Sequence, residues 1–302
     1  MSIVDKIQEL KTKHNAVILA HNYQLPEIQD IADFVGDSLG LSMQAAKVKE
    51  EVIVFCGVHF MAQTAKIISP QKTVLLPDIN AGCPMADMIT AEQLIDFKKQ
   101  HEGAKVICYV NTTAEVKAQC DLCCTSSNAV GIVEKMVGDN ETLIFVPDEN
   151  LSAFVAEKTK KNIIAWKGFC PTHANINEQD IFNAKKIYPN ALVIAHPECT
   201  QAVLKLSDVV SSTEGMCRYV KNNGDEFIVA TEVGILHKMK KENPTKLFYP
   251  AHANAICKNM KKITLEILLQ SLEEMKYAVE VEQDIADKAR VCIEKMLSVA
   301  GG

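Results

Sequence analysis

Short apolar runs alternate with longer amphipathic segments along almost the whole chain. The runs are rich in β-branched residues, and the segments between them have apolar residues at three-to-four spacing, which predicts helices. Strands alternating with helices are typical of parallel α/β proteins and not of sandwiches or bundles. The pattern predicts strands at 16–20, 52–56, 73–76, 105–110, 143–146, 162–166, 191–195, 227–230 and 246–249, and shorter ones that lead into residues 37–38, 125–126 and 212–213.

Three stretches of the chain repeat one another. "VILAHNYQ", "VICYVNTT" and "LVIAHPEC" each form a strand that runs into polar residues, and each is followed by a helix and a short strand ending at a hydroxyl residue. Two more strands and a loop cysteine complete each stretch. Four trios recur at intervals of 87 or 88 residues: Cys83, Cys170 and Cys257; Ser38, Ser126 and Thr213; His21, Tyr109 and His196; and Tyr23, Asn111 and Glu198.

The register of these trios predicts three internal repeats. With eleven cysteines in 302 residues, one evenly spaced trio is expected by chance. Four trios of polar or metal-binding residues in one register, all at strand ends, are not accidental. We predict three four-stranded parallel α/β units at 1–86, 87–174 and 175–261, with C-terminal helices at 262–302 packing back on the first. Apolar residues at three-to-four spacing predict these helices over "TLEILLQSLEEMKYAVE" and "QDIADKARVCIEKMLSVA".

Composition and charge argue against several classes of partner and location. Acidic residues outnumber basic ones, 38 to 32, and no basic cluster stands out, which argues against nucleic-acid or membrane-surface partners. The N-terminus "MSIVDKIQELKTKHN" has no apolar core of a signal peptide, and no stretch is long enough to span a membrane. A cytoplasmic location is therefore expected, where thiols stay reduced. Metal binding or redox chemistry then becomes the main alternative to core packing for the cysteines.

The four trios lie at the carboxyl ends of strands, where open parallel sheets bind ligands. If the repeats pack about a pseudo-threefold axis with these ends inward, three cysteines converge beside nine polar side chains. Three thiolates suit an iron–sulfur cluster with one open iron, a Lewis acid. Hydroxyl residues before helices favour a carboxylate or phosphate, so a small polyanion is the expected ligand.

The residues also resemble those of the quinolinate synthase family over essentially the whole chain. The similarity is carried by "ILAHNYQLPEIQDIADFVGDSLGLS", "VIVFCGVHFMAQTAKI", "YVNTTAEVKA", "CTSSNAV", "HPEC", "SSTEGM" and "MKKITLEILLQSL". The resemblance implies three homologous four-stranded parallel αβα sandwich units around a pseudo-threefold axis, with a 4Fe–4S cluster at the centre. It also implies a transferase of NAD biosynthesis that converts iminoaspartate and dihydroxyacetone phosphate to quinolinate, phosphate and water.

The family's residue roles transfer position by position. By resemblance, Cys83, Cys170 and Cys257 hold the cluster. Substrate contacts are implied for His21, Ser38, Tyr109, Asn111, Ser126, His196, Glu198 and Thr213. Tyr23 and Glu198 are the candidates for proton transfer, with His21 and His196 as further catalytic candidates. A functional link to an L-aspartate oxidase or dehydrogenase follows, because such an enzyme makes iminoaspartate.

One family feature is absent from the sequence. Some members carry a C-terminal CxxCxxC run, whereas Cys257 is followed only by "KNMKK". The third ligand is therefore unambiguous, and a disulfide switch of that kind is not expected.

Other interpretations remain open at the sequence level. Another 4Fe–4S hydro-lyase acting on a small polyanion, a zinc hydrolase using the same cysteines, an electron carrier and a metal-free binding protein are the alternatives. The "CDLCC" segment mimics half a zinc site, but no partner pair with finger spacing follows, so a core position is favoured for Cys120, Cys123 and Cys124. Cys108 and Cys292 are likewise expected in the core. His173, three residues after Cys170, either lines the site or is structural.

Overall fold

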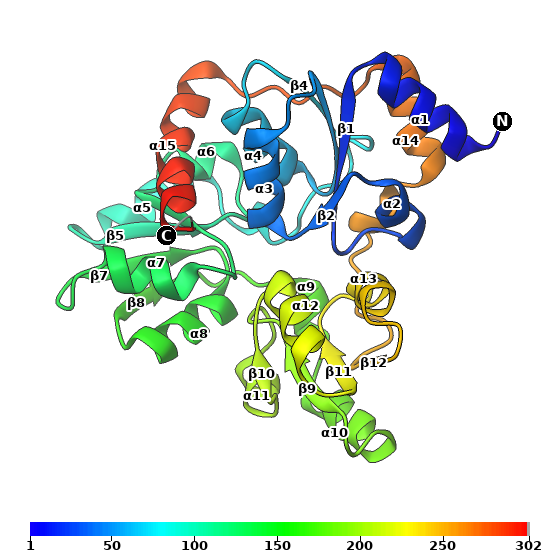
Figure 1. Ribbon diagram of the computed structural model, residues 1–302. Helices are drawn as coiled ribbons and strands as arrows, with labels where there is room; N and C mark the ends of the chain where they lie inside the picture. The colour runs from blue at the N-terminus through cyan, green and yellow to red at the C-terminus, as the bar shows by residue number, and fades with distance from the viewer. Residues whose placement is uncertain (301–302) are drawn as a thin grey trace.

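The computed structural model describes residues 1–300, which fold into three four-stranded parallel sheets with flanking helices (Figure 1). Gly301 and Gly302, the end of the predicted C-terminal segment 262–302, lie outside the described residues. The α/β class and the three αβα units predicted from the sequence are confirmed. Each predicted strand is present with ends that differ by at most one residue. The first and third strands of each unit are almost entirely buried and therefore leave short uninterrupted apolar runs in the sequence.

The three sheets share one strand order. The first is ordered β2-β1-β3-β4, the second β6-β5-β7-β8 and the third β10-β9-β11-β12, so the first strand of each unit pairs with its second and third. The strands are β1 (Ala16–His21), β2 (Phe34–Gly36), β3 (Val52–Cys56), β4 (Thr73–Leu75), β5 (Lys105–Tyr109), β6 (Leu122–Cys124), β7 (Thr142–Val146), β8 (Asn162–Ala165), β9 (Leu192–Ala195), β10 (Val209–Val210), β11 (Glu226–Ala230) and β12 (Leu247–Pro250).

Helices connect and cover these strands. In the first unit they are α1 (Ile3–Lys13), α2 (Pro26–Ile31), α3 (Ser38–Lys47) and α4 (His59–Ile68). The second unit has the 3₁₀ turn η1 (Ala86–Met88), α5 (Ala91–Lys99), α6 (Ala114–Lys117), α7 (Ala129–Met136), α8 (Glu149–Thr159) and α9 (Pro171–Ala174). The third has α10 (Glu178–Ile187), α11 (Gln201–Lys205), α12 (Thr213–Asn222), α13 (Ile235–Glu242) and the 3₁₀ turn η2 (Met260–Lys262). Among the helices of residues 1–300, none combines the length and the apolar character that crossing a membrane requires.

An aspartate before the second strand of each unit fixes that strand beside the first. In every unit its carboxylate accepts a backbone N–H of the first strand, and its own N–H donates to the carbonyl oxygen of the same residue. The pairs are Asp33 with Ile18, Asp121 with Val106 and Asp208 with Val193, with carboxylate distances of 2.8, 2.8 and 2.7 Å. This contact repeats at the 87–88-residue interval of the sequence.

The C-terminal segment differs from its predicted pattern. Its first helix, α14 (Leu265–Glu274), ends at Met275, which has a positive φ of 50°, although the apolar spacing continues. The chain after it joins the first sheet instead: Leu76 N–H donates to Tyr277 O, and Val279 N–H to Val74 O. Pairing with a sheet edge thus overrides the helical pattern.

The last two helices lie on different parts of the molecule. Helix α14 packs on α1 of the first unit, whereas α15 (Gln283–Ala300) contacts α4 of the first unit and β6, α6 and α7 of the second (Figure 1). The C-terminal segment therefore joins two units. The exact residue boundaries of the units stay a prediction.

The three units meet where their second strands end. The Ser127 hydroxyl lies 2.6 Å from the carboxylate of Asp37 and 2.9 Å from the Ser212 hydroxyl, so each unit contributes one side chain. Asp37 and Ser212 also cap α3 and α12 through the N–H groups of Gly40 and Gly215. The ends of these strands and the starts of the following helices are thereby brought to one place.

Candidate active site

Every residue that the sequence analysis proposed for the site lines one cavity. Including the part open to solvent, its volume is about 660 Å³, within the range of small-molecule sites. His21, Tyr109 and His196 lie at the ends of β1, β5 and β9. The other predicted residues that line it are Tyr23, Ser38, Asn111, Ser126, Glu198, Thr213, Cys83, Cys170 and Cys257. The structure thus brings together residues that are almost 240 positions apart in the sequence.

The three cysteines occupy equivalent loops, each after the fourth strand of its unit. In every loop, the carbonyl oxygen two residues before the cysteine accepts a backbone N–H near the start of the helix that follows the third strand: His59 to Ala81 O, Glu149 to Gly168 O and Val233 to Ala255 O, at 2.8, 2.8 and 3.0 Å. The carbonyl oxygen of the cysteine then accepts the N–H four residues later, at Asp87, Ala174 and Lys261. Each cysteine therefore begins a single helical turn.

The environment of these thiols suits a metal centre. All three are free and partly buried. Burial raises the pKa of each thiol, that of Cys83 to about 12, and for Cys83 and Cys170 the other thiols of the trio raise it further. Backbone N–H groups of the following turn point at each sulfur and act in the opposite direction. The N–H donors stabilise a thiolate, whereas the desolvated pocket disfavours its negative charge. A cation bound between the sulfurs would compensate that charge, so the two features are compatible in a metal centre.

Another part of the cavity lining suits an anion. Ser38 and Thr213 are the first residues of α3 and α12, and Ser126 lies just before α7. Helix N-termini carry free N–H groups and a positive partial charge, which favour carboxylate and phosphate groups. The Oδ1 atom of Asn111 is buried and has no hydrogen-bond partner among the described residues, so it is free to bind a ligand donor.

A hydrogen-bonded chain crosses the cavity wall. The Tyr109 hydroxyl donates to one oxygen of Glu198 at 2.6 Å, and the other oxygen lies 2.8 Å from Nδ1 of His173. Nε2 of His173 is 2.8 Å from the Thr231 hydroxyl, which is 2.6 Å from the Tyr23 hydroxyl. All five side chains are buried. The chain joins both candidate proton-transfer residues, Tyr23 and Glu198.

Burial and charge set the protonation states along this wall. Burial lowers the pKa values of His21 and His196 to about 3, so both imidazoles are neutral near pH 7. Burial raises the pKa of Tyr23, which keeps its phenol protonated. Burial also opposes ionisation of Glu198, but the electrostatic effect of the neighbouring imidazole groups and the hydrogen bonds from His173 and Tyr109 outweigh it and lower the pKa of this carboxyl. The wall therefore holds one ionised acid together with the neutral imidazoles of His21 and His196 and the protonated phenol of Tyr23.

His173 lines the site, which resolves the alternative that the sequence left open. It is buried, its ring stacks on His196 with centroids 4.8 Å apart, and its Nδ1 lies 3.1 Å from the sulfur of Cys170. Thr231 and Glu232 were missed by the sequence analysis, although they directly follow β11 and the strand-end rule applies to the third strand as well. Glu232 accepts the N–H of Cys257 at 3.1 Å and pairs with Lys261.

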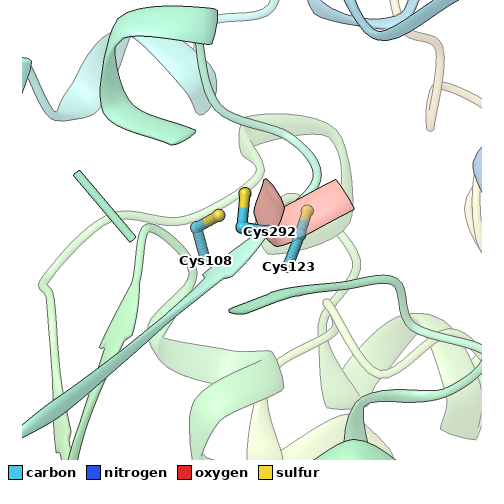
Figure 2. A group of neighbouring side chains, drawn as sticks. All are labelled: Cys108, Cys123 and Cys292. Atoms are coloured by element: carbon cyan, nitrogen blue, oxygen red, sulfur yellow. The ribbon is translucent and has the colours of Figure 1, made fainter. Parts of the chain in front are cut away.

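The structure contains a second group of thiols, apart from the cavity. Sulfur atoms of Cys108, Cys123 and Cys292 all lie within 4.8 Å of one another, and the three residues are buried (Figure 2). The sequence analysis placed all three in the core, and their burial agrees with that placement. Their mutual proximity gives a buried cysteine triad of a kind that can bind a metal.

Fold and site together define a class: a three-unit α/β enzyme with a central cavity that sets three thiols beside a polar network. The family model described as quinolinate synthetase A protein matches residues 5–298. Similar proteins named quinolinate synthase occur in Dehalococcoides mccartyi strain CBDB1 (56% identical over 298 residues, 98% of each chain) and Thermodesulfovibrio yellowstonii (53%, 98% of each). A third, from Methanosarcina barkeri, is 50% identical over 98% of this chain and 97% of its own. The chain belongs to the quinolinate synthase family, which are transferases of NAD biosynthesis.

Proposed function

We propose that this protein condenses iminoaspartate with dihydroxyacetone phosphate to quinolinate, phosphate and water, with a 4Fe–4S cluster held by Cys83, Cys170 and Cys257. The observation that carries the proposal is the convergence of three equivalent cysteine loops on one polar cavity. Family membership supports the activity. Since iminoaspartate arises by oxidation of aspartate, an L-aspartate oxidase or dehydrogenase in the same cytoplasm supplies the substrate.

The anion-binding wall fits both substrates. One carries two carboxylates and the other a phosphate, and helix N-termini with hydroxyl side chains bind such groups. We assign this role to Ser38, Ser126 and Thr213, with Asn111 and Tyr109 as further polar contacts. His21 and His196 contact substrate as neutral imidazoles, because a neutral ring can both donate and accept a hydrogen bond.

The protein's own side chains move the protons. Ring formation removes a proton beside a carbonyl group and expels hydroxyl groups, which leave poorly unless an acid assists. When bound, the cluster supplies an iron without a protein ligand, which acts as a Lewis acid towards substrate oxygen. Tyr23 is protonated and supplies a proton, while ionised Glu198 stabilises the positive charge when His173 takes one up. Thr231 links Tyr23 to His173, so the two ends exchange protons without bulk water.

Replacement of the cluster cysteines tests the proposal. Cys83→Ser, Cys170→Ser and Cys257→Ser should each lose the iron, the sulfide and quinolinate formation, measured on anaerobically prepared protein. Cys56→Ala is the matched control, because Cys56 is a free, buried cysteine of β3 that does not line the cavity. It should keep all three. Iron and sulfide at the level of the unaltered protein in any of the three serine variants would refute the ligand assignment.

A further inference from the structure

A cluster of four cysteines lies between the second sheet and the C-terminal helix, away from the candidate active site. Cys108 of β5 and Cys123 of β6 are register partners on adjacent strands, and Cys292 of α15 approaches them from the helix layer (Figure 2). Cys120, in the loop before β6, contacts the thiol of Cys108. A cysteine that only fills space has apolar neighbours, whereas the thiols of Cys108, Cys123 and Cys292 lie beside one another and Cys120 adjoins Cys108.

The arrangement resembles a closed metal site in its parts. Cys120 and Cys123 form a CxxC pair, a spacing common among zinc ligands. The partner pair that the sequence lacked at finger spacing is supplied by Cys108 and Cys292, which are 184 residues apart. Cys108, Cys123 and Cys292 have mutual sulfur distances within 4.8 Å, close to the separation of ligands around a tetrahedral ion.

A buried lysine whose backbone contacts the thiol of Cys292 is the second observation. Lys117 is fully buried, and within residues 1–300 its ammonium group has no carboxylate in ion-pair distance. Nζ donates to the carbonyl oxygens of Val110, at 2.7 Å, and Thr112, and lies 5.5 Å from the Phe60 ring centroid. A buried charge is costly without an opposite one nearby. The thiol of Cys292 donates to the backbone carbonyl oxygen of Lys117 at 3.4 Å, so this lysine borders the group of four cysteines.

We propose that Cys108, Cys120, Cys123 and Cys292 bind a structural zinc ion. Zinc with four thiolate ligands carries two net negative charges, and Lys117 balances one of them. The ion joins β5, β6 and α15, and so fastens the C-terminal helix to the second unit. Since β5 ends at Tyr109, the site also supports one edge of the active-site wall. The two groups of thiols differ in their access to solvent. Cys83, Cys170 and Cys257 line an open cavity, whereas Cys108, Cys123 and Cys292 are buried.

Metal analysis of the full chain, purified without added metal, tests the site. About one zinc per chain is expected, with X-ray absorption showing sulfur ligands at about 2.3 Å. Cys292→Ser should lower the zinc content at least about tenfold, lower the thermal midpoint and leave the iron and sulfide content unchanged. Cys124→Ala is the matched control, since Cys124 is the buried neighbour of Cys123 on β6 but lies outside the triad. It should keep the zinc.

Two further measurements distinguish loss of the zinc site from loss of the iron–sulfur cluster and from misfolding of a variant. Zinc should persist in Cys257→Ser, because the two centres share no ligand. Titration of the reduced, zinc-depleted chain with Co²⁺ alone should give the intense visible bands of tetrahedral thiolate coordination. This measurement uses the unaltered protein, so misfolding of a variant cannot affect it. The proposal is overturned if the unaltered chain holds no zinc and gives no such bands, if the zinc is lost with Cys257 and retained without Cys292, or if mass spectrometry finds a disulfide among the four cysteines.

Discussion

Replacing Glu198 by glutamine changes the charge at the centre of the hydrogen-bonded chain while keeping the side-chain shape. The carboxylate is buried and has one oxygen bonded to Tyr109 and the other to His173. The amide can still accept from Tyr109. It cannot stabilise a positive charge on His173 as the ionised acid does, so proton transfer through His173 and Thr231 should fail.

The size of the effect follows from the two interactions that are altered. Losing a general acid–base group usually slows a reaction by about 10²–10⁴-fold. We expect quinolinate formation to fall at least about a hundredfold, equivalent to about 2.7 kcal/mol in the activation free energy. Losing the charged hydrogen bond to His173 should lower the free energy of unfolding by about 1.5–3 kcal/mol. Substrate binding and the cluster should remain.

The assay measures quinolinate anaerobically with freshly generated iminoaspartate and dihydroxyacetone phosphate. Iron content and visible absorption are measured in parallel, to show that the cluster is intact. Glu178→Gln in α10 is the matched control, because it removes an exposed carboxylate of the same unit. Turnover of Glu198→Gln within a fewfold of the control would refute the reasoning and move proton transfer to Tyr23 or His196.

Three further predictions concern binding, pH and folding. Thr213→Ala should weaken substrate binding by about 1–3 kcal/mol with an unchanged cluster spectrum; ordinary KM values for both substrates would leave the hydroxyl only a structural role. Since burial lowers the pKa values of His21 and His196 from 6.5 to about 3, the unfolded chain binds more protons between these values. The free energy of unfolding should therefore decrease as the pH is lowered below 6.5, by about 1.4 kcal/mol per histidine per pH unit. An equal free energy of unfolding in urea at pH 6.5 and pH 5 would contradict this. Asp208→Ala leaves the N–H of Val193 without its partner at 2.7 Å, so the free energy of unfolding should drop by about 1–3 kcal/mol; a urea midpoint equal to that of the unaltered protein would show that the aspartate contact does not hold β10.

The class of fold and the positions of the strands were predictable from the sequence. Each unit buries its first and third strands almost entirely, so these strands appear as apolar runs, and the polar residue that follows marks the ligand-binding edge. Because the units repeat, the same polar positions recur at a constant interval, as Asp33, Asp121 and Asp208 also show in the structure. The positions of the strands and of the repeated polar residues therefore follow from interactions within a single unit.

Contacts between units could not be derived in this way. The chain from Tyr109 through Glu198 to Tyr23 joins side chains of all three units, and Thr231 enters it only because β11 ends beside β1 in space. The end of α14 was also mispredicted, because pairing with β4 outweighs a continuing helical pattern.

The cysteines illustrate the division most clearly. The sequence determined that Cys83, Cys170 and Cys257 are equivalent, since equivalence depends only on their order within a repeated unit. Only the tertiary structure decided that Cys292 meets Cys108 and Cys123, because α15 belongs to no repeat and its position depends on how it packs across two units. Periodicity reveals what each unit does locally, whereas contacts of a unique segment with distant strands are set by the packing of the whole molecule.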